Sequence, residues 1–189
     1  MDNLTCDQNR IILSMKGISK SFLGVKVLDN VDFSLRKGEV IALLGANGAG
    51  KSTLMKILCG IYKADRGQIY LNGNPVKFNA PIDAFRAGIS IVHQESSLIP
   101  TLTVMEAIFL GQECVRHAGI LNDKSMLSQY RDLSEHLGLD VSPKTKIRDL
   151  NPAQRKIAEI IKAVSRKSTI LIMDEPTESL SKEETSRLF

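Results

Sequence analysis

The sequence has little cysteine, no long apolar run and no large excess of charge of either sign, and each absence excludes a class of protein. The three cysteines, Cys6, Cys59 and Cys114, are odd in number and far apart, so neither a disulfide framework nor a zinc site is expected. No apolar run is long enough to cross a bilayer, and the polar N-terminus does not resemble a secretory signal. Lysine and arginine total 25 against 21 acidic residues, spread along the chain, so a nucleic-acid partner is not indicated.

The composition that is present suits one ordinary globular domain. Of the 189 residues, 43% are hydrophobic and 24% are charged, which is enough apolar material to bury a twisted sheet. There is no internal repeat and no low-complexity segment. The composition therefore argues against a disordered tail.

The most informative motif is a glycine-rich turn, Gly-Ala-Asn-Gly-Ala-Gly-Lys-Ser, at residues 45–52. It follows the apolar run 40–44, which predicts a β-strand, and it opens into residues 51–58, whose pattern predicts a helix. In this order, successive backbone N–H groups point at the anionic oxygens of a phosphate chain. A chance glycine-rich turn is the alternative, and the agreement of strand, loop and helix disfavours it. The motif predicts that the chain binds a nucleoside triphosphate.

Roles within this loop follow from the chemistry of its side chains. Lys51 supplies a cation for the β and γ phosphates, the Ser52 hydroxyl is placed to coordinate Mg²⁺, and Thr53 lies near the α phosphate. The expected ligands are therefore ATP and Mg²⁺. The residues expected to contact the nucleotide in this loop are Gly45, Asn47, Gly48, Ala49, Gly50, Lys51, Ser52 and Thr53.

A second candidate element is the acidic pair Asp174-Glu175, which follows the apolar run 169–173. Open α/β sheets place their chemistry at the C-terminal ends of strands, so this run delivers both carboxylates to a suitable position. Asp174 would hold the metal directly or through water, and Glu175 would polarise the attacking water. A solvent-facing acidic turn is the alternative for the pair alone, and the phosphate loop upstream favours the catalytic interpretation.

The order of the remaining elements indicates an α/β fold with a parallel core. Short apolar stretches separated by turn residues predict an antiparallel β region over 11–40, joined by a strand, an Asn-Gly turn and a return strand over 67–78. Further elements are predicted as a short helix over 81–87, buried strands over 89–92 and 169–173, helices over 103–110, 122–139 and 151–164, and a last helix that starts at the capping box of Ser181 and Glu184.

Together these motifs resemble the nucleotide-binding domain of ABC transporter ATPases, and the resemblance covers essentially the whole chain. Residues 174–177, Asp-Glu-Pro-Thr, match the family's Walker B motif, and the segment that begins His93-Gln94-Glu95 is similar to the Q-loop region of ribose-type sugar importers. The resemblance implies an α/β P-loop NTPase fold with an ABC-type antiparallel β subdomain, a parallel core sheet and an inserted helical subdomain. The expected boundaries within one nucleotide-binding domain, 1–189, are a flexible N-terminus over 1–10, an ATP-binding core over 11–94 and 167–189, and a helical subdomain over 95–166.

The resemblance assigns roles to two further residues. Gln94 would contact Mg²⁺ and the lytic water. Phe22 lies in a run that is similar to the family's adenine-stacking loop, so it is the candidate to stack on the base. A core position is the alternative interpretation of this lone phenylalanine. The expected catalytic residues are thus Glu175, Gln94 and Lys51, and the expected metal ligands are Ser52, Gln94 and Asp174.

The family's signature segment departs from its consensus in this chain. The LSGGQ motif should lie where the sequence has Leu150, Asn151, Pro152, Ala153 and Gln154. In the family, this helix N-terminus faces the γ phosphate bound by the opposite domain. Because Pro152 lacks an N–H and Ala153 adds a Cβ, we expect the partner site that this segment completes to hydrolyse ATP more slowly.

The family's switch histidine has no counterpart in the sequence. His93, His117 and His136 all precede Asp174, and the strand that should follow Glu175 is absent. The resemblance therefore implies an incomplete nucleotide-binding domain, the N-terminal piece of a longer ATPase in which two such domains are fused.

The function implied by the resemblance is ATP hydrolysis coupled to uptake of a sugar or similar small solute, on the cytoplasmic side of the cell membrane. The expected partners are a second nucleotide-binding domain, transmembrane permease subunits and, indirectly, a solute-binding protein. Partner contact is expected near 94–110, where Leu98, Ile99, Leu102 and Val104 offer apolar surface unless they are buried. Two alternatives share the nucleotide-binding residues: an ABC ATPase that acts on ribosomes or DNA, which the mild charge disfavours, and a regulatory fragment that binds nucleotide without hydrolysis, which the altered signature favours.

Overall fold

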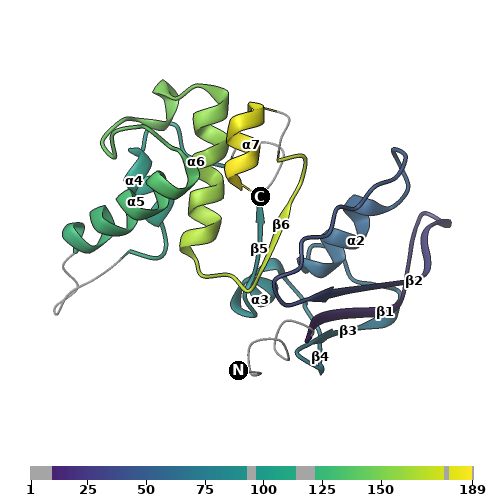
Figure 1. The fold of residues 1–189 in the computed structure, drawn as a ribbon. Coiled ribbons are helices and arrows are strands. Elements are labelled where there is room, and N and C mark those ends of the chain that lie inside the picture. The colour runs from purple at the N-terminus through teal and green to yellow at the C-terminus, as the bar shows by residue number, and fades with distance from the viewer. Residues whose placement is uncertain (1–9, 93–96, 114–121, 177–178, 189) are drawn as a thin grey trace, which may run out of the picture. The chain divides into compact units, whose positions relative to one another are not determined.

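The computed structural model describes residues 10–92, 97–113, 122–176 and 179–188 (Figure 1). Its contacts divide the chain into two compact units, Met1–Ala87 and Gly88–Phe189, called here the first and the second unit. In the described part of the chain, no helix combines the length and the apolar composition needed to cross a bilayer.

The first unit contains a four-stranded antiparallel sheet in the order β2-β1-β3-β4 (Figure 1). β1 and β2 form a long hairpin that closes with Phe22 opposite Val25, and Leu23 in the turn has φ 48°. β3 and β4 are joined by Asn72 and Gly73, both with positive φ, as a tight hairpin turn requires. The predicted antiparallel region and Asn-Gly turn are confirmed. The strands are β1 (Ile11–Phe22), β2 (Val25–Arg36), β3 (Arg66–Leu71) and β4 (Asn74–Val76).

The buried face of this sheet is built mainly by β1. Leu13 and Met15, two residues apart, are fully buried, as the alternation of a strand requires. A register shift after Met15 moves Ile18 onto the same buried side. Among its described residues, the unit also has two helices, α2 (Lys51–Leu58) after the glycine-rich loop and α3 (Pro81–Arg86).

One predicted strand of the first unit is not formed. The run 40–44 belongs to no strand in the structure, and its residues Val40 and Leu44 are 76% and 90% exposed. A strand requires a neighbouring backbone to complete its hydrogen-bond ladder, and no described strand pairs with this run. The prediction from apolar composition alone was therefore wrong for this segment.

The second unit is built around two parallel strands, β5 (Ile89–Val92) and β6 (Ile170–Met173). Their register places Ile89 opposite Ile170 and Val92 opposite Met173. This confirms the two predicted buried strands and the parallel pairing. The backbone N–H of Asp174 donates to the Val92 carbonyl at 3.1 Å, so the pairing continues into the acidic pair.

The helices of the second unit begin within one residue of the starts that the sequence predicted. Asn122 accepts from the Ser125 N–H, and Thr103 accepts from the Glu106 N–H, so both act as N-caps. The elements are α4 (Val104–Phe109), α5 (Asp123–Leu137), the short 3-10 helix η2 (Ile147–Asp149), α6 (Pro152–Ser165) and α7 (Lys182–Leu188).

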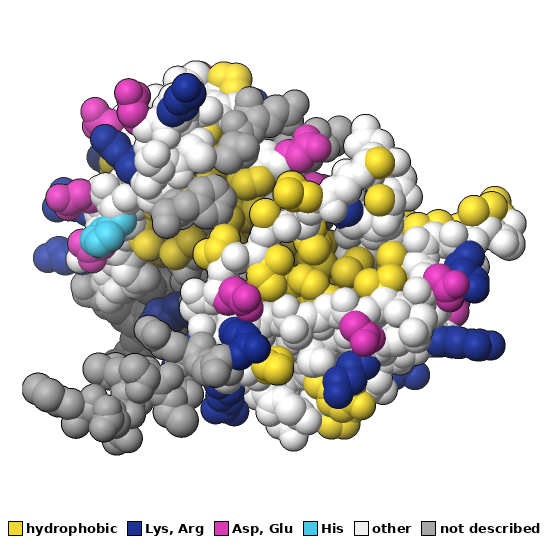
Figure 2. Space-filling model, turned by 45° about the vertical axis from the view of Figure 1, so that its right-hand side comes forward, with side chains coloured by type: hydrophobic (Ala, Val, Ile, Leu, Met, Phe, Trp, Pro, Cys, Tyr) yellow, Lys and Arg dark blue, Asp and Glu magenta, His cyan; other side chains and the backbone are white. Residues whose placement is uncertain are grey.

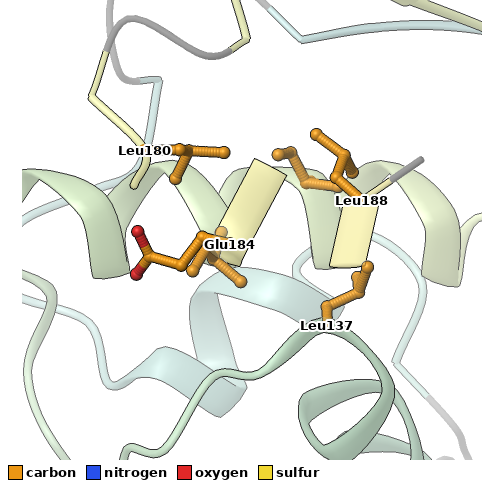
Figure 3. Close-up of a pocket in the computed structure, with 6 residues that line it drawn as sticks. Leu137, Leu180, Glu184 and Leu188 are labelled. Atoms are coloured by element: carbon orange, nitrogen blue, oxygen red, sulfur yellow. The ribbon is translucent and has the colours of Figure 1, made fainter. Parts of the chain in front are cut away.

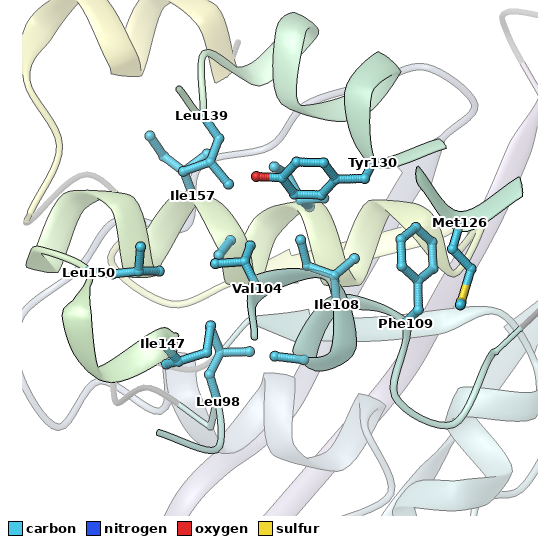
Figure 4. Packing of buried hydrophobic residues seen from close by; sticks show 13 residues of the cluster. Leu98, Val104, Ile108, Phe109, Met126, Tyr130, Leu139, Ile147, Leu150 and Ile157 are labelled. Atoms are coloured by element: carbon cyan, nitrogen blue, oxygen red, sulfur yellow. The ribbon is translucent and has the colours of Figure 1, made fainter. Parts of the chain in front are cut away.

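α4, α5, η2 and α6 pack around a common apolar core (Figure 4). Val104 and Ile108 of α4 are fully buried, and Ile157 of α6 is 4% exposed. Tyr130 of α5 lies in the same cluster, and its hydroxyl donates to the Val141 carbonyl at 2.7 Å. The buried hydroxyl is thus satisfied, which removes the penalty of an unpaired polar group in the core.

Candidate functional site

The glycine-rich loop leads directly into the N-terminus of α2 in the first unit. Gly50 is the N-cap residue with φ 88°, and its carbonyl accepts from the Leu54 N–H at 2.9 Å. Among the described residues, no side chain caps α2, and its first turn contains no acidic group. The positive end of the helix and its N–H groups are therefore left for an external anion.

The loop packs against the start of β2 at Gly50. A Cβ built on Gly50 would lie 2.7 Å from Leu28 Cδ2 and 3.0 Å from the Val27 carbonyl oxygen. Such distances are too short for any side chain, so this position requires glycine both for its left-handed backbone and for its close approach. The contact fixes the loop against the β1-β2 hairpin.

The Lys51 ammonium lies inside its own loop. Its Nζ donates to the Gly45 carbonyl at 2.7 Å and to the Ala46 carbonyl at 2.9 Å. An ammonium has three N–H donors, so two hold its position and one remains for a phosphate oxygen. The predicted cation is therefore held over the loop, beside the uncapped helix end.

Oxygen ligands suited to Mg²⁺ are present at the predicted positions. Ser52 is exposed in the first turn of α2, and Asp174 is exposed at the end of β6 in the second unit. Hydroxyl and carboxylate oxygens are the ligands that this hard cation takes alongside nucleotide phosphates. Both side chains thus fit the metal in chemical type.

Glu175 has a strained backbone. Its φ is 46°, in the left-handed region, which costs a residue with a Cβ roughly 1–2 kcal/mol. Strained residues of this kind cluster at functional sites, but the hairpin turns of this chain also contain them, at Leu23 and Asn72. The backbone of Glu175 therefore fits both the catalytic interpretation and a tight turn.

Several predicted residues lie outside the described part of the chain. Gln94 is among them, together with its neighbours His93 and Glu95, so its roles toward metal and water stay predictions. Cys6, Cys114, His117 and Thr177 also lie outside it.

Cys59 and His136 both lie within the described part of the chain. Cys59 is a free, buried thiol at the end of α2, and burial raises its pKa to about 11. His136 is exposed in the last turn of α5, where it interacts with the Asp132 carbonyl.

Phe22, the candidate for base stacking, is half-buried at the tip of the β1-β2 hairpin. The centroid of its ring lies 5.1 Å from the centroid of the Tyr62 ring, with an interplanar angle of 68°. Sequence reasoning missed Tyr62, because nothing in the local pattern pairs it with a residue so distant in the chain. The Lys20 ammonium lies 5.4 Å from the Phe22 ring centre.

The signature segment satisfies its own helix end. The Gln154 N–H donates to Asn151 Oδ1 at 2.8 Å, and the Asn151 N–H donates to Gln154 Oε1 at 3.1 Å. Pro152 occupies the first helical position and has no N–H to offer. The start of α6 therefore has little donor capacity left for a phosphate, in contrast to the start of α2.

The apolar surface expected near 94–110 is largely interior. Leu98 is 6% exposed, Val104 is fully buried, and Leu102 is half-buried against the same core. Ile99 remains 46% exposed. Most of the side chains expected to contact a partner are thus buried, which was the alternative interpretation. They fill the core between α4 and α6.

The second unit also contains a small apolar hollow between α5, α6 and α7 (Figure 3). Its one charged lining group, Glu184, accepts from the Ser181 N–H at 2.7 Å, and this hydrogen bond holds the pKa of the carboxyl below its usual range. No cation lines it in the described structure, so it does not suit a phosphate. The lining residues are Leu137, Ile157, Ile160, Leu180, Glu184 and Leu188.

Charges are interspersed on the face of the molecule shown in Figure 2. Basic and acidic side chains alternate there among the described residues, without a broad area of one sign. The mild net charge of +4 is thus not gathered on this face.

Comparison with known proteins adds independent evidence. The family model described as ABC transporter matches residues 28–178. The chain is 47% identical over 178 residues to the putative ribose/galactose/methyl galactoside import ATP-binding protein 2 of Burkholderia lata, covering 94% of this chain and 34% of that protein. It is 48% identical to the ribose import ATP-binding protein RbsA of Caldanaerobacter subterraneus, covering 94% of this chain and 36% of that protein. The chain thus spans about a third of the length of these relatives.

Solved structures with the same fold include MJ1267, an ATP-binding cassette of an ABC transporter, in its ADP conformation. The TM-score is 0.80 at 26% identity, with 94% of this chain and 74% of that chain covered. The structure of cbiO1 from Clostridium perfringens, part of the transporter complex cbiONQ, gives a TM-score of 0.79 at 25% identity, covering 95% of this chain and 71% of that chain. The predicted α/β P-loop NTPase fold is thereby confirmed.

Proposed function

The chain belongs to the ABC transporter family, and we propose that it binds and hydrolyses ATP to drive import of a sugar or a similar small solute. The observation that carries the proposal is the glycine-rich loop, whose uncapped helix N-terminus and inward-held Lys51 ammonium form a receptor for a phosphate chain. The solute class is supported by the relatives, which are named as ribose and galactose import ATP-binding proteins.

The residues divide the reaction between binding and water activation. Lys51 and the loop N–H groups bind the β and γ phosphates, and Ser52 and Asp174 hold Mg²⁺. Bound Mg²⁺ supplies further neutralisation of the phosphate charge. Glu175 orients and polarises the attacking water, with Gln94 assisting on the strength of the family resemblance. Catalysis then comes mainly from positioning and charge neutralisation.

Phe22 stacks on the base in this proposal. Two observations support the role: the ring is half-exposed at the hairpin tip, and β2 of the same hairpin contacts the phosphate loop at Gly50. Val27, which meets Gly50, lies two residues from Val25, the partner of Phe22, a strand distance of roughly 7 Å. A nucleotide spans such a separation between its phosphates and its base.

The signature segment contributes weakly to the opposite nucleotide site. The closed capping box at Asn151 and Gln154 and the missing N–H of Pro152 support slower hydrolysis at the site it completes. The partners in this proposal are a second nucleotide-binding domain, transmembrane permease subunits and, indirectly, a solute-binding protein. The chain works on the cytoplasmic side of the membrane, with its ATP-binding core over 11–94 and 167–189 and its helical subdomain over 95–166.

Calorimetric titration with Mg·ATP tests the nucleotide site through Lys51→Ala. Loss of a charge-assisted contact to phosphate weakens binding about 10- to 100-fold. Lys77→Ala is the matched control, because it removes an exposed lysine of the same unit that lies outside the loop. Unchanged affinity in Lys51→Ala would contradict the proposal.

Phosphate release measured with the full-length protein and its membrane partners tests the hydrolytic step. We expect Glu175→Gln to keep ATP affinity and lose turnover, since the amide cannot act as a base. ATP binding without phosphate release in the wild type would instead favour a regulatory, binding-only module.

A further inference from the structure

The Phe22 ring lies at an exposed end of the sheet, where few neighbouring side chains of the hairpin tip can pack against it. It is the last residue of β1, and the neighbours Leu23 and Val25 at the hairpin tip are 106% and 67% exposed. A side chain between such neighbours receives little packing from the hairpin tip, so its orientation depends on the other contacts of its ring. The ring contacts given by the structure are with Tyr62 and with the Lys20 ammonium.

Tyr62 is fixed to the helix that begins at the phosphate loop. The Ile61 N–H and the Tyr62 N–H both donate to the Lys56 carbonyl, at 2.9 Å and 3.2 Å. The Lys56 ammonium lies 5.7 Å from the centre of the Tyr62 ring, within the range of a cation–π contact. Both the backbone and the ring of Tyr62 are therefore tied to the last turn of α2.

The segment that carries Tyr62 also holds the backbone next to Phe22. Asp65 Oδ2 accepts from the Ser21 N–H at 2.7 Å, and Asp65 Oδ1 accepts from Lys20 Nζ at 2.7 Å. The Asp65 N–H in turn donates to the Ser19 carbonyl at 2.9 Å. The carboxylate and the backbone N–H of Asp65 thus both fix the end of β1 to the segment after α2.

Two connections therefore join the base-stacking candidate to the phosphate loop. One runs through β2, which meets Gly50 at Val27 and Leu28. The other runs from α2 through Tyr62 to the Phe22 ring, where the geometry is the edge-to-face arrangement that aromatic pairs prefer. The second connection sets the ring orientation, which the first leaves open.

We propose that Tyr62 is a positioning residue for nucleobase recognition, which orients the Phe22 ring relative to the phosphate loop. The inference rests on the proposed nucleotide-binding function and on Phe22 as the stacking residue. A ring that is already oriented loses less freedom when the base stacks on it, so Tyr62 acts on affinity for the base and not on affinity for phosphates.

Calorimetric titration of the full chain with Mg·ATP and with magnesium tripolyphosphate separates the two contributions. We expect Tyr62→Leu to weaken ATP binding about 3- to 10-fold and to leave tripolyphosphate binding unchanged. Tyr62→Phe keeps the ring and restores wild-type ATP affinity. Tyr70→Leu is the matched control, because Tyr70 also contacts a lysine ammonium, that of Lys16 at 5.7 Å, but lies on β3 away from Phe22.

A double-mutant cycle with Phe22→Leu decides whether Tyr62 acts through Phe22. In the Phe22→Leu background, Tyr62→Leu should cause no further loss of ATP affinity. An equal loss in both backgrounds, or an equal loss for ATP and tripolyphosphate, would overturn the positioning role. Failure of the wild type to bind either ligand would instead overturn the proposed function, and the inference with it.

Discussion

At the scale of single residues, Gly50 is the most constrained position of the phosphate loop. We expect Gly50→Ala to lower the free energy of unfolding and to weaken ATP binding, because its Cβ would meet Leu28 Cδ2 at 2.7 Å while φ stays at 88°. Gly38→Ala is the control: φ is 72° but nothing lies within 4 Å, so the cost is only left-handed strain of about 1 kcal/mol. Urea unfolding and ATP titration of both variants measure the difference, and equal losses would contradict the steric explanation.

At the residue scale, the features that could be predicted from the sequence are the local ones. The glycine-rich loop that opens into α2 was predictable because Gly45, Gly50 and Lys51 act through their own backbone and immediate neighbours, while their roles toward a nucleotide stay predictions. The Phe22–Tyr62 contact could not be read, because it depends on how the segment after α2 returns to the end of β1. For the same reason the burial of Leu98 stayed open until the packing of the second unit was known.

At the scale of elements, the capping box of α4 supplies a pH-dependent contribution. The Thr103 N–H and hydroxyl both donate to Glu106 Oε2 at 2.8 Å, and these hydrogen bonds hold the pKa of Glu106 below its usual 4.5. A carboxyl with a lowered folded-state pKa stabilises the fold above its unfolded pKa, and this contribution is lost as pH falls through the folded pKa. We therefore expect urea unfolding to show a smaller loss of stability on acidification in Glu106→Gln than in the wild type.

Thr103→Ala tests the same capping box at neutral pH. Loss of the N-cap costs about 1 kcal/mol, and Thr101→Ala, two residues earlier and outside the box, should cost nothing measurable. Equal effects of the two substitutions, or a Glu106→Gln variant with the acid response of the wild type, would argue against the box.

Helices were easier to predict than strands, because a helix forms its hydrogen bonds within its own segment. α5 and α6 could be placed within a residue or two, because the helical spacing of their apolar residues lies within each segment. Their caps, Asn122 and Asn151, likewise act on the helix's own N–H groups. The run 40–44 carries the same apolar signal as β6 but forms no strand, since a strand exists only with a paired neighbour. Strand prediction from composition therefore fails where no neighbouring strand pairs with the apolar segment.

At the scale of the whole molecule, the two units differ in how they are held together. The first unit is dominated by the long β1-β2 hairpin, and the second by a helical core around the β5-β6 pair (Figures 1 and 4). Unfolding is therefore best followed unit by unit, because a single transition is not guaranteed for a chain with two compact parts. Hydrogen exchange of α2 amides reports on the unit that contains the phosphate loop.

Mg·ATP should slow this exchange in a way that depends on the loop lysine. A ligand that binds only the folded state at 100 times its dissociation constant stabilises it by about 2.7 kcal/mol, which corresponds to roughly 100-fold slower exchange for amides that exchange through opening of that unit. Removal of the metal with EDTA should reduce the slowing, because the proposed complex then loses the Mg²⁺ charge that neutralises the phosphates. Under the same ATP concentration, Lys51→Ala should exchange several-fold faster than the wild type, since its fractional occupancy falls with its affinity. Exchange rates that respond to ATP identically in wild type and Lys51→Ala would place the bound nucleotide somewhere other than the glycine-rich loop.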